Sequence, residues 1–509
     1  MPRSAPECLV LDLAGAKALS TGAIGPLTPL RRQDEAETPF VALDDFDQSL
    51  RRSGRLLVES DGTLLLLQAD GSVLSQPGRA QAASVTGLPE GAVKAALTDL
   101  SPLRSLLPVG KGQMRRSTVA FVDDEGKSQA RVHLLQLDQT GGDAIALVTL
   151  QGLRGYPGAI ADLRAQALAI GGRVLEMNSL IVRLFPDRLP YEAKPTVDVR
   201  ADQTAFDAAS HIIAAYIPVA RANEAGIVAD HDSEFLHDYR IALRKIRSVL
   251  SLFRGVYDPD QTADLKARFS RLMAPTGRLR DLDVSLLDQQ TYVDLLPKSL
   301  HAGLEAKFAI LARERKAARA RLARHLLQEG YLREIAALAG LFESRAALLP
   351  GPNADQPARV FACALIWKRY RKICRIAQNI TPDTDDAEVH GLRIECKKLR
   401  YLMEFFGPMF PKDEFRSLLK PLKALQDNLG LVNDCAVQQA NLQLFVHGTG
   451  TRGKTVPLDI AQSVGAQTAV LHRRQIEERA RTGTSLAQFT SPQTMQTFRN
   501  LFHAARDRT

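Results

Sequence analysis

The sequence has few of the residues that mark disulfide-rich, metal-binding or base-stacking proteins. Its 509 residues include one tryptophan, and its five cysteines are odd in number with no C-x-x-C pair. This excludes a disulfide framework and a C-x-x-C zinc or redox motif, so we expect the cysteines to be buried. They are Cys8, Cys363, Cys374, Cys396 and Cys435.

Long apolar runs are also missing. No stretch approaches the roughly 18 uninterrupted apolar residues that mark a membrane span. The first residues lack the basic start and the apolar core of a secretory signal. We therefore expect a cytoplasmic protein with no membrane partner.

The residues that are present are typical of a globular protein with more than one domain. Hydrophobic residues make up 45% of the chain and charged residues 24%, and the length favours two or three domains. The net charge of +9 is unevenly placed: residues 1–202 carry 22 basic against 24 acidic residues, whereas residues 203–509 carry 44 against 33. A basic partner surface is expected in the C-terminal part.

Up to about residue 155, short apolar stretches alternate with turn dipeptides such as Asp61-Gly62 and Asp70-Gly71. This pattern predicts an antiparallel sheet. A helix is expected after Tyr156-Pro157-Gly158, and Pro186, Pro190 and Pro195 predict a linker. The candidate strands are residues 55–59, 63–68, 73–75, 115–122, 130–138 and 144–151, with further turns at 123–126 and 141–142.

From residue 203 onward the pattern changes to long helical periodicity, interrupted at Pro350-Gly351-Pro352. We predict a helical domain over 203–509, with halves at about 203–349 and 356–509. The two patterns together predict an α+β multidomain protein.

The helical part contains an internal repeat at a fixed offset of 153 residues. HDYRIALRKIR at 237–247 aligns without a gap on HGLRIECKKLR at 390–400, and the longer alignment has 12 identities in 48 positions. Such self-similarity indicates duplication.

Each copy predicts an amphipathic helix with one cationic face. At 100° per residue the basic positions fall within about 80° of one another, opposite the apolar ones. The cationic positions are His237, Arg240, Arg244 and Arg247 in the first copy and His390, Arg393, Lys397 and Arg400 in the second. The apolar positions are Ile246, Val249, Leu250 and Phe253, and Leu399, Leu402, Met403 and Phe406. Lys245 and Lys398 are expected on the flanks.

A solvated helix face is the plain alternative for any charged stripe. Exposed helices usually mix signs to gain i,i+4 pairs, yet residues 237–247 hold one acid, Asp238, against four Arg or Lys. We therefore favour a site for a polyanion, in which Arg gives forked donors and Lys gives point charge. The histidines stand among Arg and Lys rather than carboxylates, which disfavours a metal.

Further residues extend the candidate surface. Arg280, Lys420 and Lys423 are added to it, as weaker members. Gly277 and Gly430 are expected to end helices, and Asp281 and Asp434 are expected to cap or brace the next helix.

With these motifs in view, the C-terminal part resembles the CHAD domain, a histidine-containing α-helical domain. The resemblance rests on the doubled H-x-x-R-x-x-x-[RK]-K-x-R and on LRDLD at 279–283 and LQDNLGLVND at 425–434. It implies two pseudo-symmetric four-helix bundles with a basic surface that binds inorganic polyphosphate, and an association with polyphosphate granules. The resemblance implies that the histidines and basic residues of the two stripes bind polyphosphate: His237, Arg240, Arg244, Lys245, Arg247, His390, Arg393, Lys397, Lys398 and Arg400. Arg280, Lys420 and Lys423 complete the predicted binding set as the further basic residues named above.

Residues 1–195 resemble a degenerate CYTH, or triphosphate tunnel, domain. The resemblance rests on the segments 46–54 (FDQSLRRSG), 115–118 (RRST), 124–127 (DEGK) and 144–151 (AIALVTLQ). It implies an antiparallel β tunnel or barrel. Active members carry Glu-x-Glu-x-Lys near the start, which is missing here, so we expect no metal, no cofactor and no catalysis.

The leading hypothesis is a non-catalytic polyphosphate-binding protein of the cytoplasm, at polyphosphate granules. Nucleic-acid binding is an alternative, because phosphate contacts dominate that affinity. It is disfavoured, since few aromatics accompany the stripes. A phosphohydrolase acting through the N-terminal domain is the other alternative. A homo-oligomer is left open.

Overall fold

The chain folds into two compact units, Met1–Glu192 and Ala193–Thr509. The structure, a computed structural model, describes residues 7–80, 84–141, 144–185, 191–381, 383–450 and 456–503. The first unit is built on an antiparallel sheet and the second is helical, which confirms the expected α+β class. Gly142 of one expected turn, and Pro186 and Pro190 of the expected linker, lie outside the described residues.

The first unit holds a ten-stranded sheet in the order β10-β1-β9-β8-β7-β3-β4-β5-β6, with β2 paired to β7. All six strands expected from the sequence are present. The sequence did not predict four of the strands, β1, β2, β3 and β10. The strand β2 has the sequence TPLRRQD and is almost wholly exposed, so it lacks the alternation of apolar and polar residues that would have predicted it. The strands are β1 Glu7–Asp12, β2 Thr28–Asp34, β3 Thr38–Asp44, β4 Leu56–Ser60, β5 Thr63–Leu67, β6 Val73–Pro77, β7 Leu107–Val122, β8 Ser128–Gln139, β9 Ala144–Gly152 and β10 Arg173–Val174.

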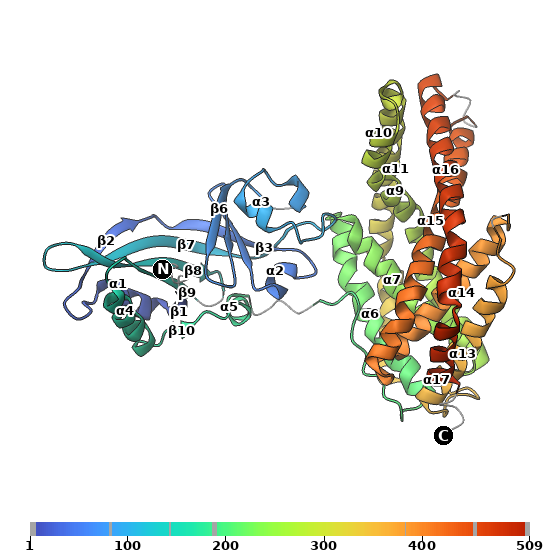
Figure 1. Cartoon of the computed structure of the whole chain (residues 1–509), viewed down its shortest axis with the longest axis horizontal. Helices are drawn as coiled ribbons and strands as arrows, with labels where there is room; N and C mark the ends of the chain where they lie inside the picture. Colours follow the sequence, from blue (N-terminus) through green and yellow to red (C-terminus); the bar gives the residue numbers. More distant parts are fainter. Residues whose placement is uncertain are drawn as a thin grey trace. The chain divides into compact units, whose positions relative to one another are not determined.

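The sheet curls into a half-barrel with an apolar inner face (Figure 1). Cys8 of β1 and Leu67 of β5 are far apart in the strand order, yet they belong to one buried cluster with helix α5, Met177–Leu184. Helices cover the outer face: α1 Leu13–Thr21 and α4 Pro157–Ala169 on one cluster, and α3 Ala92–Ala96 on another. α5 therefore fills the side on which a tunnel would need polar ligands.

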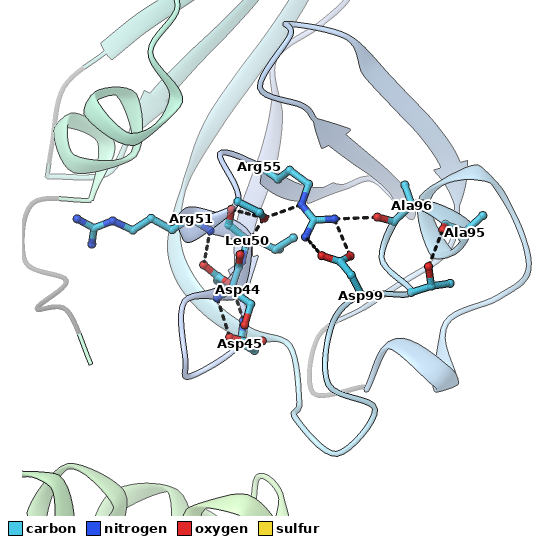
Figure 2. A network of polar contacts seen from close by, with 11 residues as sticks. Asp44, Asp45, Leu50, Arg51, Arg55, Ala95, Ala96 and Asp99 are labelled. Atoms are coloured by element: carbon cyan, nitrogen blue, oxygen red, sulfur yellow. Dashed lines mark hydrogen bonds and ion pairs between the residues drawn. The ribbon is translucent and has the colours of Figure 1, made fainter. Parts of the chain in front are cut away.

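Acidic residues near α2, Ser49–Arg52, hold the backbone of this unit (Figure 2). Asp44 accepts hydrogen bonds from the amides of Leu50 at 2.9 Å and Arg51 at 3.1 Å, and burial raises its pKa to about 6. Arg55 pairs with Asp99 at 2.6 Å and donates to the Ala96 carbonyl at 2.8 Å. These carboxylates are engaged in structural contacts.

The second unit is helical throughout its described secondary structure, apart from isolated bridges. Its helices are α6 Ala205–Ala229, α7 Ser233–Leu252, α8 Pro259–Met273, α9 Gly277–Leu287, α10 Gln289–Leu295, α11 His301–Leu326, α12 Glu329–Ser344, α13 Ala358–Ala377, α14 Asp386–Phe406, α15 Lys412–Gly450, α16 Leu458–Phe489 and α17 Pro492–Phe502. α6 is long and apolar enough to span a membrane, but half of its most apolar stretch is buried, and it packs on α7, α11 and α12 as a core helix does.

Helix starts follow the offset of the sequence repeat. Ala205 and Ala358 begin α6 and α13, and Ser233 and Asp386 begin α7 and α14, each pair 153 residues apart. α8 and α15 begin at the same offset. In the second half the single helix α15 spans the stretch that α8, α9 and α10 share in the first.

The two Asp-Gly turns of the sheet allow a test of whether the curl of the sheet brings the turn at Gly71 against β1, because the turn at Gly62 has no such neighbour. Gly71 has φ of +81°, and an added Cβ would lie 2.2 Å from Cys8 Cβ; Gly62 has φ of +66° with no atom within 4 Å. Gly62→Ala should cost about 1–2 kcal/mol for the left-handed backbone alone, and Gly71→Ala about 1–3 kcal/mol more for the clash. Urea unfolding of both variants measures the difference. Equal costs would show that the turn does not press on β1.

Candidate functional site

Helix α7 presents its cationic stripe because its other face is committed to the core. Asp232 caps the helix and accepts hydrogen bonds from the amides of Glu234 and Phe235. The apolar positions predicted for both copies are buried: Ile246, Val249, Leu250 and Phe253 in α7 and its C-terminus, and Leu399, Leu402, Met403 and Phe406 in α14. These predictions are confirmed, and the opposite faces are left with the basic side chains.

The two stripe helices contact each other through residues that are equivalent in the repeat. The rings of Phe253 and Phe406 stack with centroids 4.9 Å apart and planes 12° apart. Thr204 and Pro357, also equivalent, form a β-bridge. When equivalent residues touch, a pseudo-two-fold axis passes between them.

The charges of the two stripes act on each other at a third equivalent pair, Arg244 and Lys397. Burial lowers the pKa of Lys397 to about 8, and the charges of Arg393 and Arg244 add to this effect, while Asp434 opposes it. In the described part of the chain, no carboxylate forms an ion pair with Arg244 or Lys397. The two cations thus repel each other, with the charge of Asp434 as a partial offset. We call the eight stripe residues, four from each copy, the paired surface.

Several guanidinium groups at this surface keep unused donors. Among the described residues, Arg240 Nε, Arg280 Nη1 and Arg393 Nε are buried and have no hydrogen-bond partner. Arg240 donates through another nitrogen to Thr276 Oγ1, and Arg393 to Asp434 at 3.3 Å. Burial and the nearby Arg244 lower the pKa of Arg240. Buried donors without partners are costly, and an anion would accept from them.

Two basic residues of the repeat have other partners. Lys245 is 6% exposed, contacts Glu404, and lies 4.5 Å from the centre of the Tyr401 ring. Burial, with Arg400 as a secondary cause, lowers its pKa to about 7. Lys398 pairs with Glu395 at 2.9 Å. That both bind a ligand stays a prediction.

Glu395 forms ion pairs with further basic residues. It also pairs with Arg369 and Lys372. Burial opposes its ionisation, but the hydrogen bonds from Lys398 and Arg369 prevail and lower the pKa of Glu395 to about 2. The basic cluster of α13 is therefore partly neutralised inside the protein.

The other members of the paired surface have contacts or burial of their own. His390 Nδ1 contacts Asn433 Oδ1, and His237 is partly buried on α7. Arg400 pairs with Glu404 at 3.1 Å, and Arg247 lies 3.1 Å from Met273 Sδ. The remaining predicted residues are Arg280 of α9, whose charge acts on Arg240, and Lys420 and Lys423, which are exposed on α15.

The expected helix stops are wrong. Gly277 follows the short 3-10 helix Ala274–Thr276 but is also the first residue of α9, and Gly430 lies inside α15, so the chain stays helical through both glycines. Asp281 and Asp434 consequently lie within these helices and cap nothing. Asp434 instead braces the surface through Arg393. In both places the backbone continues with right-handed helical geometry, which glycine tolerates.

Some residues that hold the surface have no clear signal in the sequence. Thr276 and Asn433 contact Arg240 and His390 from other helices, so only the tertiary fold brings them there. Glu404 is four residues after Arg400, a spacing that predicts an ion pair on a helix. Its contact with Lys245, across the two copies, follows from the packing of α7 on α14.

The half-barrel offers little of what a metal needs. Within the described residues, no group of three or more His, Cys, Asp or Glu could hold a metal ion. A cavity of about 310 Å³ on the inner side is lined by apolar and polar residues in similar numbers, and its charged residues Arg116 and Glu35 are paired to each other at 2.7 Å. His133 Nδ1 lies 3.1 Å from Thr118 Oγ1.

Comparison with known proteins identifies the helical unit. Residues 211–443 match the family model described as the CHAD domain, a family linked to polyphosphate binding. A crystal structure of the CHAD domain from the plant Ricinus communis is similar at 26% identity, covering 62% of this chain and 97% of that one, with a TM-score of 0.47. PptA from Streptomyces chartreusis is similar at 17% identity, covering 56% and 99%, with a TM-score of 0.42. No curated protein matches.

Lys245 and its repeat equivalent Lys398 give a matched pH test. A pKa of about 7 for Lys245, against an ordinary value of 10.5, means that the unfolded chain binds more protons between these values. The free energy of unfolding should therefore rise with pH by up to about 1.4 kcal/mol per unit. In urea unfolding between pH 7 and 9, Lys245→Met should lose this part of the rise and Lys398→Met should keep it. An unchanged slope in Lys245→Met would mean that Glu404 keeps the lysine charged.

Proposed function

This chain carries a CHAD domain over residues 211–443, and we propose that it binds inorganic polyphosphate at the paired surface. The observation that carries the proposal is that the charge of Arg244 acts on Lys397 while neither residue forms an ion pair with a carboxylate among the described residues. Like charges held together by the fold lower stability unless a ligand neutralises them. A chain of phosphates supplies negative charge on both sides of the pseudo-two-fold axis.

The donors of the surface suit phosphate oxygens. Arg240 and Arg393, equivalent in the repeat, each keep a buried Nε without a partner, and guanidinium groups bind phosphate by forked hydrogen bonds. A flexible polyanion held by one copy stays near the other, so the second contact gains from effective concentration. A long ligand therefore fits the duplication better than a single phosphate.

Nucleic acid is the second candidate, because it presents the same phosphates. Binding of single strands normally uses exposed aromatic rings on which bases stack. The aromatic side chains beside the paired surface, Tyr401 and Phe405, are buried, and their rings face Lys245. This favours polyphosphate, which has no bases.

We further propose that the N-terminal unit is not catalytic and that the protein acts at polyphosphate granules in the cytoplasm. The first part is supported by the apolar inner face, filled by α5, and by acids such as Asp44 and Asp99 that are engaged in structural contacts. The relation of this unit to CYTH domains stays a proposal. A phosphohydrolase would need metal-bearing carboxylates.

Neutralising the stripes should separate binding from folding. Changing Arg240, Arg244 and Arg247 to Gln, or Arg393, Lys397 and Arg400 to Gln, should weaken polyphosphate binding more than tenfold, since each charge-assisted contact is worth about 1.5–3 kcal/mol. The six changes together should nearly abolish binding and flatten its salt dependence. Titration calorimetry at several salt concentrations measures this, and circular dichroism checks the helices.

A matched control removes the same charge elsewhere. Arg313, Lys316 and Arg333 are exposed on α11 and α12, and their change to Gln should leave the affinity within a small factor. If the sixfold variant stayed helical and bound polyphosphate as tightly as the parent, the paired surface would be a solvated face. If DNA bound more tightly than polyphosphate at equal phosphate concentration, the second candidate would replace the first.

Catalysis is tested by phosphate release. With Mg²⁺ or Mn²⁺ and triphosphate, the purified protein should release no phosphate above background, because two-metal hydrolysis needs oxygen ligands that the apolar inner face does not supply. A malachite-green assay measures it. Sustained turnover that is abolished by substitutions within residues 1–155 would overturn the non-catalytic proposal.

A further inference from the structure

A second cavity lies in the helical unit, apart from the paired surface. It measures about 820 Å³ and lies between α9, α10 and α11 on one side and α15 and α16 on the other (Figure 1). This volume is within the range of pockets for small molecules. About half of its lining is apolar, including Leu282, Ile310, Leu311, Leu442, Ile460 and Leu471. The charged residues of the lining are Arg278, Asp281, Asp288, Lys307 and Glu314. None of the eight residues of the paired surface lines it.

The ammonium group of one lysine is buried at this cavity. Lys307 is 4% exposed, and its Nζ donates to Gln467 Oε1 at 2.5 Å. No carboxylate in the described part of the chain forms an ion pair with it. Asp288, whose charge acts on Lys307, accepts a hydrogen bond from Gln438 at 2.6 Å. Burial lowers the pKa of Lys307 to about 8, which shows the cost of keeping the charge there.

The amide that holds Lys307 has a donor to spare. Gln467 is fully buried, and its Nε2 has no hydrogen-bond partner among the described residues. Buried polar groups are normally satisfied, and one left open at a cavity indicates a missing ligand. Lys307 and Gln467 thus offer two adjacent donors, one of them charged, in a pocket of which about half the lining is apolar.

We propose that this cavity binds a carboxylate with an apolar body, such as a medium-chain fatty acid. The two carboxylate oxygens accept from Lys307 and Gln467, and the hydrocarbon lies against Leu282, Leu311 and Leu442. Two cations line the cavity, and Arg278 is paired with Glu314, so a single negative charge would supply the ion pair that Lys307 lacks among the described residues. A phosphate dianion would leave a second charge buried and unpaired, which is costly. The proposal is independent of polyphosphate binding, since the two sites share no stripe residue.

Titration calorimetry of the full chain with decanoate, decanol and acetate tests the proposal. Decanoate should bind, decanol should bind about tenfold or more weakly for want of the charge-assisted contact, and acetate should not bind detectably. Lys307→Met keeps the length of the side chain and removes its charge; it should weaken decanoate about tenfold or more and leave decanol unchanged. Lys316→Met, an exposed lysine of the same helix, should change neither.

The outcomes are distinct. Failure of decanoate to bind, or equal binding by the parent and by Lys307→Met, would overturn the proposal. Equal binding of decanol and decanoate would also overturn it, because the cavity would then select for apolar surface alone. Arg244→Gln should keep the affinity for decanoate, so loss of the polyphosphate function and loss of this site remain separate results. Thermal melting checks that Lys307→Met is folded.

Discussion

The rest of the helical unit depends on the contact between α7 and α14. Phe253 and Phe406 stack, and the apolar faces behind them are buried, so the helices cannot move apart without exposing these rings to water. The same contact brings Arg244 close enough to Lys397 for its charge to lower the pKa of that lysine. Apolar burial thus supplies the free energy that holds like charges together, and the surface is preorganised for an anion before one arrives.

The cations around this contact divide into two kinds. Lys245 and Lys398 are equivalent in the repeat, and both have carboxylate partners, Glu404 and Glu395. Arg244 and Lys397 lack such partners in the described part of the chain. Since neutralised charges contribute little to long-range attraction, the unpaired ones dominate the field that a polyanion meets. Equivalent positions of the two copies therefore play similar roles: one pair is neutralised by carboxylates and the other, among the described residues, is not. The carboxylates themselves, Glu404 and Glu395, are not equivalent in the repeat.

Much of the fold and of the candidate surface could be predicted from the sequence, because local patterns determine them. Alternating apolar residues and Asp-Gly turns marked the strands β4 to β9, and helical spacing marked the buried face of each stripe helix. Two of the strands that the sequence did not predict lack such a pattern. β2 is nearly all exposed, and β10 is two residues long, so neither leaves a periodic signal. Gly430 was misread because glycine inside a helix and glycine at its end look alike in sequence.

The features that the sequence could not reveal are tertiary contacts between distant segments. Nothing in the order of residues places Glu404 against Lys245, or leaves Gln467 with an open donor beside Lys307. The curl of the sheet, which puts α5 where a tunnel would be open, also follows from packing among distant segments. In the N-terminal unit the acids near α2 are used for caps and ion pairs, which a motif search does not distinguish from ligands.

The most direct test of the paired surface is the titration of Lys397 itself. NMR of protein with ¹³C-labelled lysine follows each ammonium group, and the signal of Lys397 is assigned by Lys397→Arg. Without ligand its pKa should be about 8. With polyphosphate at the surface the charged form is favoured, and the pKa of Lys397 should rise clearly toward its ordinary value, while the chemical shift of the exposed Lys316 should change little when polyphosphate is added. If polyphosphate bound and the pKa of Lys397 did not change, the ligand would lie elsewhere and the paired surface would not be its site.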